Sequence, residues 1–380
     1  MPATKSIGPW PPALGPQIIA RAPLRISFGG GGTDLAAYYE RHEGLVVSAA
    51  IGRYCTVTVT DTPDGGMRIV SADYGVEETY APGELPQVAE PLALPKAVLE
   101  WFVSRGHLPV GGFALHLSSE VPPGTGLGSS SAMTVALIRA LAARARLVLD
   151  AAAVAELASW IEITRLGMPI GKQDQYASAF GGLNTIDFRA DGVTVRPLTL
   201  DAPMRAALDE RLLLFSTGQR RDSATILGQQ RQATGTDALT IARLGRLKAL
   251  AAEMVATLHD GDLDLFGRLL DVAWREKRGL SSRVSSAAID RWYEAALAAG
   301  ALGGKITGAG GGGFLLLYSP PGAAPTVRAA LARDDLRELP FAFDRLGARI
   351  EGAQGGAVVS TNRQQAPPGG EGGGVFAAED

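Results

Sequence analysis

The sequence predicts a two-domain α+β protein, and three observations support this fold class. The chain has 380 residues, enough for two ordinary domains that share a large interface. Strand-like apolar runs dominate residues 17–198. Helical patterns fill much of residues 221–299. Runs of strands followed by runs of helices are typical of an α+β architecture.

The first half alternates strand-like runs with a few helices. We expect helices that begin near Leu35, near residue 95, after residue 128, at Asp150 as a cap, and near Lys172. The helix after residue 128 has apolar residues at i, i+3, i+4, i+7 and i+8, which is one helical face. The expected strands cover residues 17–28, 45–51, 54–61, 67–71, 77–80, 113–118, 183–188 and 193–198.

Residues 200–211 connect the first half to the second, which begins with an apolar strand over 212–215. Three or four helices follow within 221–299, and a glycine loop then enters an apolar strand that ends near Tyr318. A helix over 325–333 and strands over 339–343 and 348–351 complete the fold. We therefore expect four parts: a flexible arm over 1–18, domains over 19–200 and 201–352, and a disordered tail over 353–380.

Composition excludes several classes of function. The formal net charge of -3 gives no reason to expect nucleic acid as a partner. No run of about 18 apolar residues predicts a membrane span. The N-terminus lacks a signal-peptide layout, and the single cysteine, Cys55, fits a reducing compartment. We expect a cytoplasmic protein, either a monomer or a homodimer, whose partner is a small molecule.

The segment PPGTGLGSSSA, residues 122–132, is a glycine-rich loop that runs directly into a helix. Such a loop lets backbone N–H groups approach an anion and adds the positive end of the helix dipole. No Lys follows the glycines, so this is not a Walker A loop. The alternative is a glycine-rich turn in which a serine caps the helix.

Four glycines, Gly29 to Gly32, precede Thr33 and Asp34. Either of these polar residues could simply cap the helix that follows. Four successive glycines are more than a cap requires, and they indicate that the backbone passes close to a ligand.

Three separated glycine-rich segments resemble the signature motifs of the GHMP small-molecule kinases. These are RAPLRISFGGGGTDL (residues 21–35), PPGTGLGSSSA (122–132) and KITGAGGGG (305–313). The resemblance covers about residues 19–352. It implies an N-terminal ribosomal-S5-domain-2-like ATP-binding domain and a C-terminal ferredoxin-like α/β sandwich. Within the family, RISFGGGGTD together with PIGKQDQYASAFGG (169–182) is most similar to the D-glycero-D-manno-heptose 7-phosphate kinases.

The resemblance also implies the reaction and its residues. ATP would be the phosphoryl donor, Mg²⁺ the metal, and O1 of the sugar the acceptor. Asp174 matches the catalytic aspartate and Arg25 the cation near the transferred group, while Ser130 and Glu162 match the metal contacts. The segments that would hold the nucleotide are Pro123, Gly124, Thr125, Gly126, Leu127, Gly128, Ser129, Ser130, Ser131, Gly308, Gly310 and Gly311.

The same comparison implies which residues hold the sugar. If the sugar carries a phosphate, Lys172 beside Asp174, or Arg220 and Arg221 in STGQRRDS, would bind it. Adjacent arginines on a loop can equally be surface charge. The implied sugar-binding residues are Gly30, Gly31, Thr33, Asp34, Lys172, Gln173, Arg220 and Arg221.

Three other functions remain open at this point. A kinase of an unphosphorylated sugar, of the fucose or galactose type, would use the same motifs. An NAD(P)-dependent oxidoreductase would need a GxGxxG turn that opens a helix and an acidic ribose partner, and neither the first nor the second loop supplies it. A nucleotide-binding regulator could keep the loops without the chemistry, but the presence of both Glu162 and Asp174 argues against it.

Overall fold

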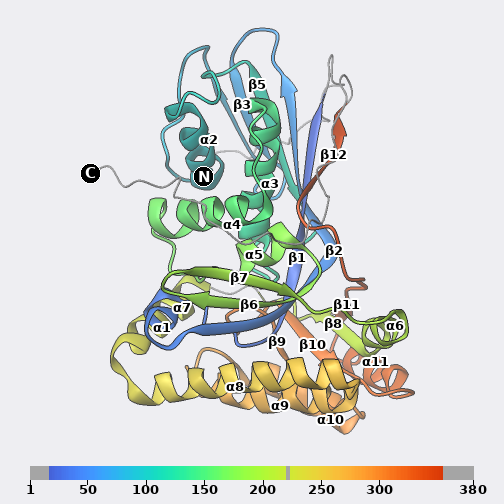
Figure 1. The fold of residues 1–380 in the computed structure, drawn as a ribbon. Helices are drawn as coiled ribbons and strands as arrows, with labels where there is room; N and C mark the ends of the chain where they lie inside the picture. The colour runs from blue at the N-terminus through green and yellow to red at the C-terminus, as the bar shows by residue number, and fades with distance from the viewer. Residues whose placement is uncertain (1–16, 220–222, 354–380) are drawn as a thin grey trace.

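A computed structural model describes residues 17–219 and 223–353. Its larger sheet has the strand order β12-β1-β2-β5-β3-β4, with β6 and β7 branching from β2 (Figure 1). All pairs in this sheet are antiparallel except β3 with β5. Its strands are β1 Ile18–Gly29, β2 Gly44–Asp61, β3 Met67–Ser71, β4 Val76–Tyr80, β5 Phe113–Ser119, β6 Leu183–Arg189, β7 Gly192–Pro197 and β12 Arg349–Ala353.

Strand β2 is one continuous strand of 18 residues, so the prediction of two strands over 45–51 and 54–61 is wrong in this detail. Its first part pairs with β6 and its second part with β5, while β1 runs beside both. The register against β1 shifts between Pro23 and Leu24. Proline has no N–H to donate to the ladder, so a bulge there lets β2 bend without breaking.

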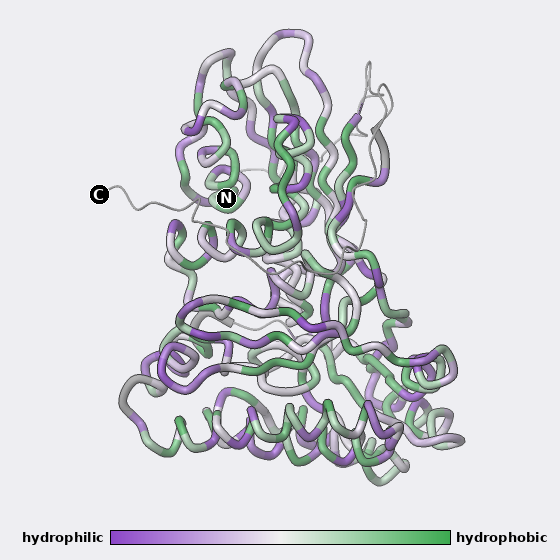
Figure 2. Tube along the Cα trace, in the orientation of Figure 1, coloured by the Kyte–Doolittle hydropathy of each residue, from purple (hydrophilic) through white to green (hydrophobic). Residues whose placement is uncertain are grey.

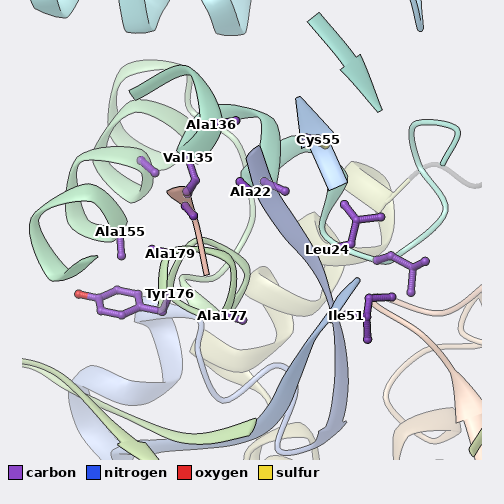
Figure 3. Packing of buried hydrophobic residues seen from close by; sticks show 14 of the residues in the cluster. Ala22, Leu24, Ile51, Cys55, Val135, Ala136, Ala155, Tyr176, Ala177 and Ala179 are labelled. Carbon is purple, nitrogen blue, oxygen red and sulfur yellow. The ribbon is translucent and has the colours of Figure 1, made fainter. Parts of the chain in front are cut away.

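Helix α3 is the centre of the first half. It packs against β1, β2, α2, α4 and α5. It is therefore buried on more than the single face that the sequence predicts. Figure 3 shows Val135 and Ala136 of α3 close to Ala155 of α4 and to Tyr176, Ala177 and Ala179 of α5. The helices of this half are α1 Ala36–His42, α2 Ala93–Ser104, α3 Ser129–Ala145, α4 Ala151–Ser159 and α5 Gln173–Phe180, with a π-helical turn, η1, over Trp160–Arg165.

Two helix boundaries follow the predicted local chemistry. The Asp150 carboxylate accepts a hydrogen bond from the Ala153 N–H at 2.7 Å and caps α4, as predicted. After η1 the chain leaves the helix near Gly167, whose φ is +66°.

The second half contains a four-stranded sheet with the order β11-β8-β10-β9. Helices α8 and α9 pack along each other, and α9 covers β9. Figure 2 shows hydrophobic and hydrophilic residues alternating along α8 and α9, the pattern of helices with one buried face. The strands are β8 Leu212–Ser216, β9 Gly303–Ile306, β10 Phe314–Tyr318 and β11 Arg337–Glu338, and the helices are α6 Ala202–Arg211, α7 Ser223–Thr236, α8 Ala238–Asp260, α9 Leu263–Arg278, α10 Ala287–Ala298 and α11 Ala324–Ala332.

The predicted strand over residues 339–343 is wrong. This segment is held at single points: the Leu339 N–H donates to Leu214, the Gly52 N–H donates to the Ala342 carbonyl, and Phe343 forms an isolated bridge with Ile51. Pro340 lacks an N–H, so a regular ladder cannot continue through it. The chain then returns to the first sheet as β12, which pairs with β1.

Some predictions remain outside what the structure describes or tests. The predicted arm falls mainly on residues 1–16, and the predicted tail on residues 354–380, outside the described ranges. The domain boundaries stay a prediction. Among the described helices, none is long and apolar enough to cross a membrane.

The two halves meet at their glycine loops. The Thr307 hydroxyl of the second half donates to the Thr125 carbonyl of the first half at 3.4 Å. The buried Lys305 ammonium donates to the carbonyls of Ser27 and Phe28 at the end of β1. Strand β9 is thereby fixed to β1 across the boundary between the halves.

We expect Gly313→Ala to lower the free energy of unfolding by about 3 kcal/mol. Gly313 has a φ of +92°, and a Cβ there would overlap the Thr125 carbonyl oxygen. Chemical denaturation measures the loss. Gly322→Ala is the matched control, because Gly322 has a φ of +83° but open space around it, so only backbone strain of about 1 kcal/mol is expected. Equal losses in the two variants would contradict the role of the Thr125 contact.

Candidate active site

A cleft lies where the N-terminus of α3, the end of β1, the start of α5, and the helices α7 and α9 converge. Its lining includes parts of all three glycine-rich segments, which are far apart in the sequence. Tertiary folding therefore brings the predicted motifs to one place.

The loop before α3 forms one end of this cleft through Gly124, Gly126 and Gly128. Gly128 is the N-cap of α3 in the left-handed conformation, with a φ of +75°, and no side chain caps the helix. The first intrahelical bond runs from the Ala132 N–H to the Gly128 carbonyl. The N–H groups of the preceding helix residues therefore have no intrahelical acceptor, and they lie at the positive end of a 17-residue helix. The alternative prediction, in which a serine side chain caps the helix, is therefore wrong.

Three residues of this loop do not line the cleft. Leu127 is fully buried, and its carbonyl accepts the Arg25 N–H. The Thr125 hydroxyl donates to the Pro122 carbonyl, and Pro123, like Thr125, is not among the lining residues. These residues shape the loop, while the glycines and Ser129, Ser130 and Ser131 face the cleft.

Glu162 lies behind the serines and is completely buried. Its carboxylate accepts hydrogen bonds from the Ser130 hydroxyl at 2.8 Å and from the Gln175 amide at 2.7 Å. Burial raises the pKa of Glu162 to about 7. In the described part of the chain no lysine or arginine forms an ion pair with it. A divalent cation bound by Glu162 and Ser130 would supply the missing positive charge.

The oxygen donors of Glu162 and Ser130 suit Mg²⁺, which does not require all of its ligands to come from protein. No group of three or more His, Cys, Asp or Glu side chains that could hold a metal occurs in the described residues. Mg²⁺ commonly takes one or two carboxylates and completes its shell with phosphate oxygens and water. One carboxylate and one hydroxyl beside the glycine loop at the start of α3 match that preference.

Asp174 and Arg25 form an ion pair in the middle of the cleft. Arg25 is almost completely buried, and its Nε and Nη2 atoms each lie 2.7 Å from Asp174 Oδ1. Arg25 also donates from Nη1 to the Gly126 carbonyl at 2.6 Å. A Cβ on Gly128 would lie 3.3 Å from Asp174 Oδ2, so the second carboxylate oxygen faces the loop. Arg25 thus fixes one oxygen of Asp174 and leaves the other facing the loop before α3.

Asp34 occupies the other end of the cleft. Its carboxylate accepts hydrogen bonds from the Gly32 N–H, the Gln173 N–H and the Gln173 side-chain amide, at 2.9, 3.2 and 3.0 Å. Burial raises its pKa, and the charge of Asp174 adds to the effect. The N-cap of α1 is Leu35, without a side-chain bond, so Asp34 and Thr33 do not cap that helix.

The predicted sugar-binding residues separate into two groups. Gly31, Asp34 and Gln173 line the cleft. Thr33 does not, because its hydroxyl donates to the carbonyls of Gly30 and Leu45 and holds the glycine turn in shape. Gly30 packs against Leu45 and is not part of the lining.

The remaining cations are not brought into the described cleft. The Lys172 ammonium lies 2.9 Å from Glu156, and Lys172 is absent from the lining. Arg220 and Arg221 lie outside the described residues.

The second half supplies a wall of its own. Gly308 and Ala309 line the cleft, and Lys277 of α9 lines it and donates to the Gly308 carbonyl. Gly310 and Gly311 instead pack against the backbone of Val284 and Arg283. Leu227 and Gln230 of α7 complete this wall. Sequence reasoning missed Lys277 and Gln230, which lie in none of the quoted motifs, and Gln175, which lies within PIGKQDQYASAFGG but was given no role. The basic end of α9 was the visible signal for Lys277.

Comparisons with known proteins agree with this geometry. Residues 93–182 match the model of the GHMP kinases N terminal domain, and residues 248–338 match that of the GHMP kinases C terminal domain. The chain is 31% identical over 333 residues to the D-glycero-alpha-D-manno-heptose 7-phosphate kinase of Campylobacter jejuni, covering 87% of this chain and 98% of that protein.

The chain belongs to the GHMP kinase family.

This GHMP kinase is also similar to a solved structure described as a D-glycero-D-manno-heptose 1-phosphate kinase from Bacteroides thetaiotaomicron, with a TM-score of 0.75 and 28% identity over 88% of this chain and 98% of that one. It is 26% identical to the galactokinase of Pyrococcus furiosus, covering 86% of this chain and 95% of that protein. The predicted two-domain GHMP fold and the assignment to a phosphotransferase acting on a sugar hydroxyl are confirmed. The oxidoreductase alternative is excluded.

We expect Asp174→Asn to lower kcat about 10³-fold while KM for ATP changes by less than about twofold. The amide cannot take a proton from the acceptor hydroxyl, whereas its oxygen can still accept from Arg25, and Arg25 keeps its bond to the Gly126 carbonyl of the loop. Steady-state assays of ADP release measure both constants. Asp61→Asn is the control, because Asp61 pairs with Arg144 at an exposed site. Near-normal turnover of Asp174→Asn would remove Asp174 from the reaction.

Proposed function

We propose that this GHMP kinase transfers the γ-phosphoryl group of ATP to O1 of D-glycero-D-manno-heptose 7-phosphate. The product would be the 1,7-bisphosphate, which serves the synthesis of a nucleotide-activated heptose. One observation carries the proposal: a single cleft joins an uncapped helix N-terminus, the Arg25–Asp174 pair and the polar end around Asp34. The similarity to the Campylobacter jejuni heptose 7-phosphate kinase supports the substrate class.

The residues of the cleft suit an in-line phosphoryl transfer. The backbone N–H groups at the start of α3 hold the phosphates of ATP. The sugar hydroxyl lies between Asp34 and Asp174, attacks the γ-phosphorus and gives its proton to Asp174. The bond between the γ-phosphorus and the β–γ bridging oxygen breaks, and ADP leaves. Arg25 balances the charge of Asp174 and lies beside the loop, where it stabilises charge on the transferred group.

Glu162 and Ser130 would hold Mg²⁺ against the phosphates. The ion neutralises phosphate charge when it is bound. The protein side chains position it: Gln175 donates to one oxygen of Glu162, which orients the carboxylate, and Ser130 bridges to the loop.

A second candidate, a kinase of an unphosphorylated sugar, is favoured by one observation. Among the described residues that line the cleft, the cations are Arg25 and Lys277, and Arg25 is committed to Asp174. Lys172, one of the predicted phosphate ligands, pairs with Glu156 instead. The similarity to a galactokinase is compatible with this candidate. Arg220 and Arg221 remain predicted phosphate ligands.

A substrate screen separates the two candidates. We expect ADP release with D-glycero-D-manno-heptose 7-phosphate at a kcat/KM at least about 100-fold above that with mannose, fucose or galactose. The phosphorylated product is located by phosphorus NMR, where a new anomeric phosphate signal is expected. Activity confined to an unphosphorylated sugar would reject the heptose 7-phosphate assignment.

We expect Glu162→Gln to raise the Mg²⁺ concentration at half-maximal rate by about tenfold or more, because a neutral amide is a poor ligand for this hard cation. The thermal midpoint should not fall, since the substitution removes a buried charge that lacks a protein cation. A Mg²⁺ titration of ADP release gives the first value. Glu156→Gln is the control on the adjoining helix α4, because Glu156 binds Lys172 and neither residue lines the cleft. An unchanged Mg²⁺ dependence would place the metal elsewhere.

A further inference from the structure

The sugar end of the cleft contains buried polar atoms that the described protein does not satisfy. They are the hydroxyl oxygen of Ser27, the amide oxygen of Gln173 and the amide nitrogen of Gln230. Ser27 and Gln230 are only 3% and 7% exposed, and all three residues line the cleft. Buried polar groups in folded proteins almost always have hydrogen-bond partners, so three such atoms at one wall indicate a ligand that supplies them.

Two glycines bring the three atoms together. A Cβ on Gly31 would lie 3.6 Å from the Ser27 hydroxyl and 3.8 Å from the Gln173 amide nitrogen. A Cβ on Gly32 would overlap the Gln230 amide nitrogen. The three polar groups therefore surround one short stretch of backbone without side chains.

The backbone conformation of Gly31 does not require a glycine, but the space beside it does. Gly30 and Gly32 have φ values of +79° and +99°, but Gly31 is not among the residues with a positive φ. A residue with a side chain could adopt its conformation, yet it would cover Ser27 and Gln173. The glycine keeps those groups open to the cleft.

The three unsatisfied atoms differ in whether they donate or accept hydrogen bonds. The Gln173 amide nitrogen donates to Asp34, so its free oxygen can only accept. Gln230 offers a donor, and the Ser27 hydroxyl can do either. A wall with an acceptor, a donor and a hydroxyl suits the hydroxyl groups of a sugar. A phosphate is disfavoured there, because the Asp34 carboxylate is part of the same wall.

We propose that Ser27, Gln173 and Gln230 bind the ring hydroxyls of the sugar, and that Gln230 is a specificity-determining residue contributed by the second half of the chain. This proposal rests on the function as a sugar kinase and not on the position of the sugar's phosphate. Because Gln230 of the second half lies against Gly32, close to Ser27 and Gln173 of the first, sugar recognition requires both halves to be correctly placed.

The test combines enzyme variants with deoxy sugars in a double-mutant cycle. Gln230→Met removes the donor at nearly constant volume, and Gln229→Met is the matched control, because Gln229 is the exposed neighbour on the same helix. The sugar is whichever compound the wild type phosphorylates best, together with its monodeoxy analogues. Failure of the heptose assignment would therefore appear in the substrate screen, and failure of this proposal only in the cycle.

We expect Gln230→Met to lower kcat/KM for the full sugar about tenfold, with an unchanged KM for ATP, while Gln229→Met matches the wild type. For one deoxy analogue, Gln230→Met and the wild type should be equally active, because the hydroxyl that Gln230 binds is missing. An equal loss with every analogue, or a wild-type kcat/KM in Gln230→Met, would overturn the proposal.

Two further variants keep the test decisive if Gln230→Met folds poorly. Ser27→Ala should lower kcat/KM for the sugar and show the same cancellation with a different deoxy analogue. Gly31→Ala should raise KM for the sugar at least about tenfold without lowering the thermal midpoint, because its backbone needs no glycine. Wild-type sugar constants in both variants would also overturn the proposal.

Discussion

The ion pair between Arg25 and Asp174 is the interaction on which the rest of the site depends. A buried guanidinium is costly without a partner, and Arg25 donates to the loop carbonyl of Gly126 and pairs with Asp174. Since Arg25 belongs to β1, these contacts set the distance between the sheet, the loop before α3 and the start of α5. Asp174 is thereby held with one oxygen fixed and the other directed toward the loop. The shape of the cleft and the packing of the first half thus depend on the same side chain, Arg25.

The second constraint is the close approach of backbones at the glycine loops. Gly313 lies against Thr125, Gly128 lies against Asp174, and Gly171 lies against Asp34. Side chains at these positions would separate the elements that form the cleft. The buried ammonium of Lys305 adds a tie from β9 to the end of β1, and burial together with Lys277 and Arg25 holds its pKa well below the ordinary value. The glycines therefore permit the assembly of the cleft.

The buried carboxylates of Glu162 and Asp34 lower the stability of the folded protein, because their charged forms are poorly solvated. Burial raises the pKa values of Glu162 and Asp34, and neither forms an ion pair with a lysine or arginine among the described residues. Perturbed acids of this kind cluster at functional sites. Glu162 lies behind the serines at the start of α3, and Asp34 lies beside Gln173. Asp174, paired with Arg25, is close enough for its charge to raise the pKa values of both carboxylates further.

The sequence by itself determined what depends on neighbouring residues. The loop before α3, the Asp150 cap and the first-turn position of Asp174 follow from local chemistry, and the three glycine motifs identify the family. Tertiary structure decided the rest, because those features depend on partners far away in the chain. Strand β2 is continuous because β1, β5 and β6 all pair with it. Lys172, close to Asp174 in the sequence, was a predicted phosphate ligand, but in the structure it forms an ion pair with Glu156 of α4. Gln230 and Lys277 reach the cleft only through the packing of α7 and α9, which no local pattern encodes.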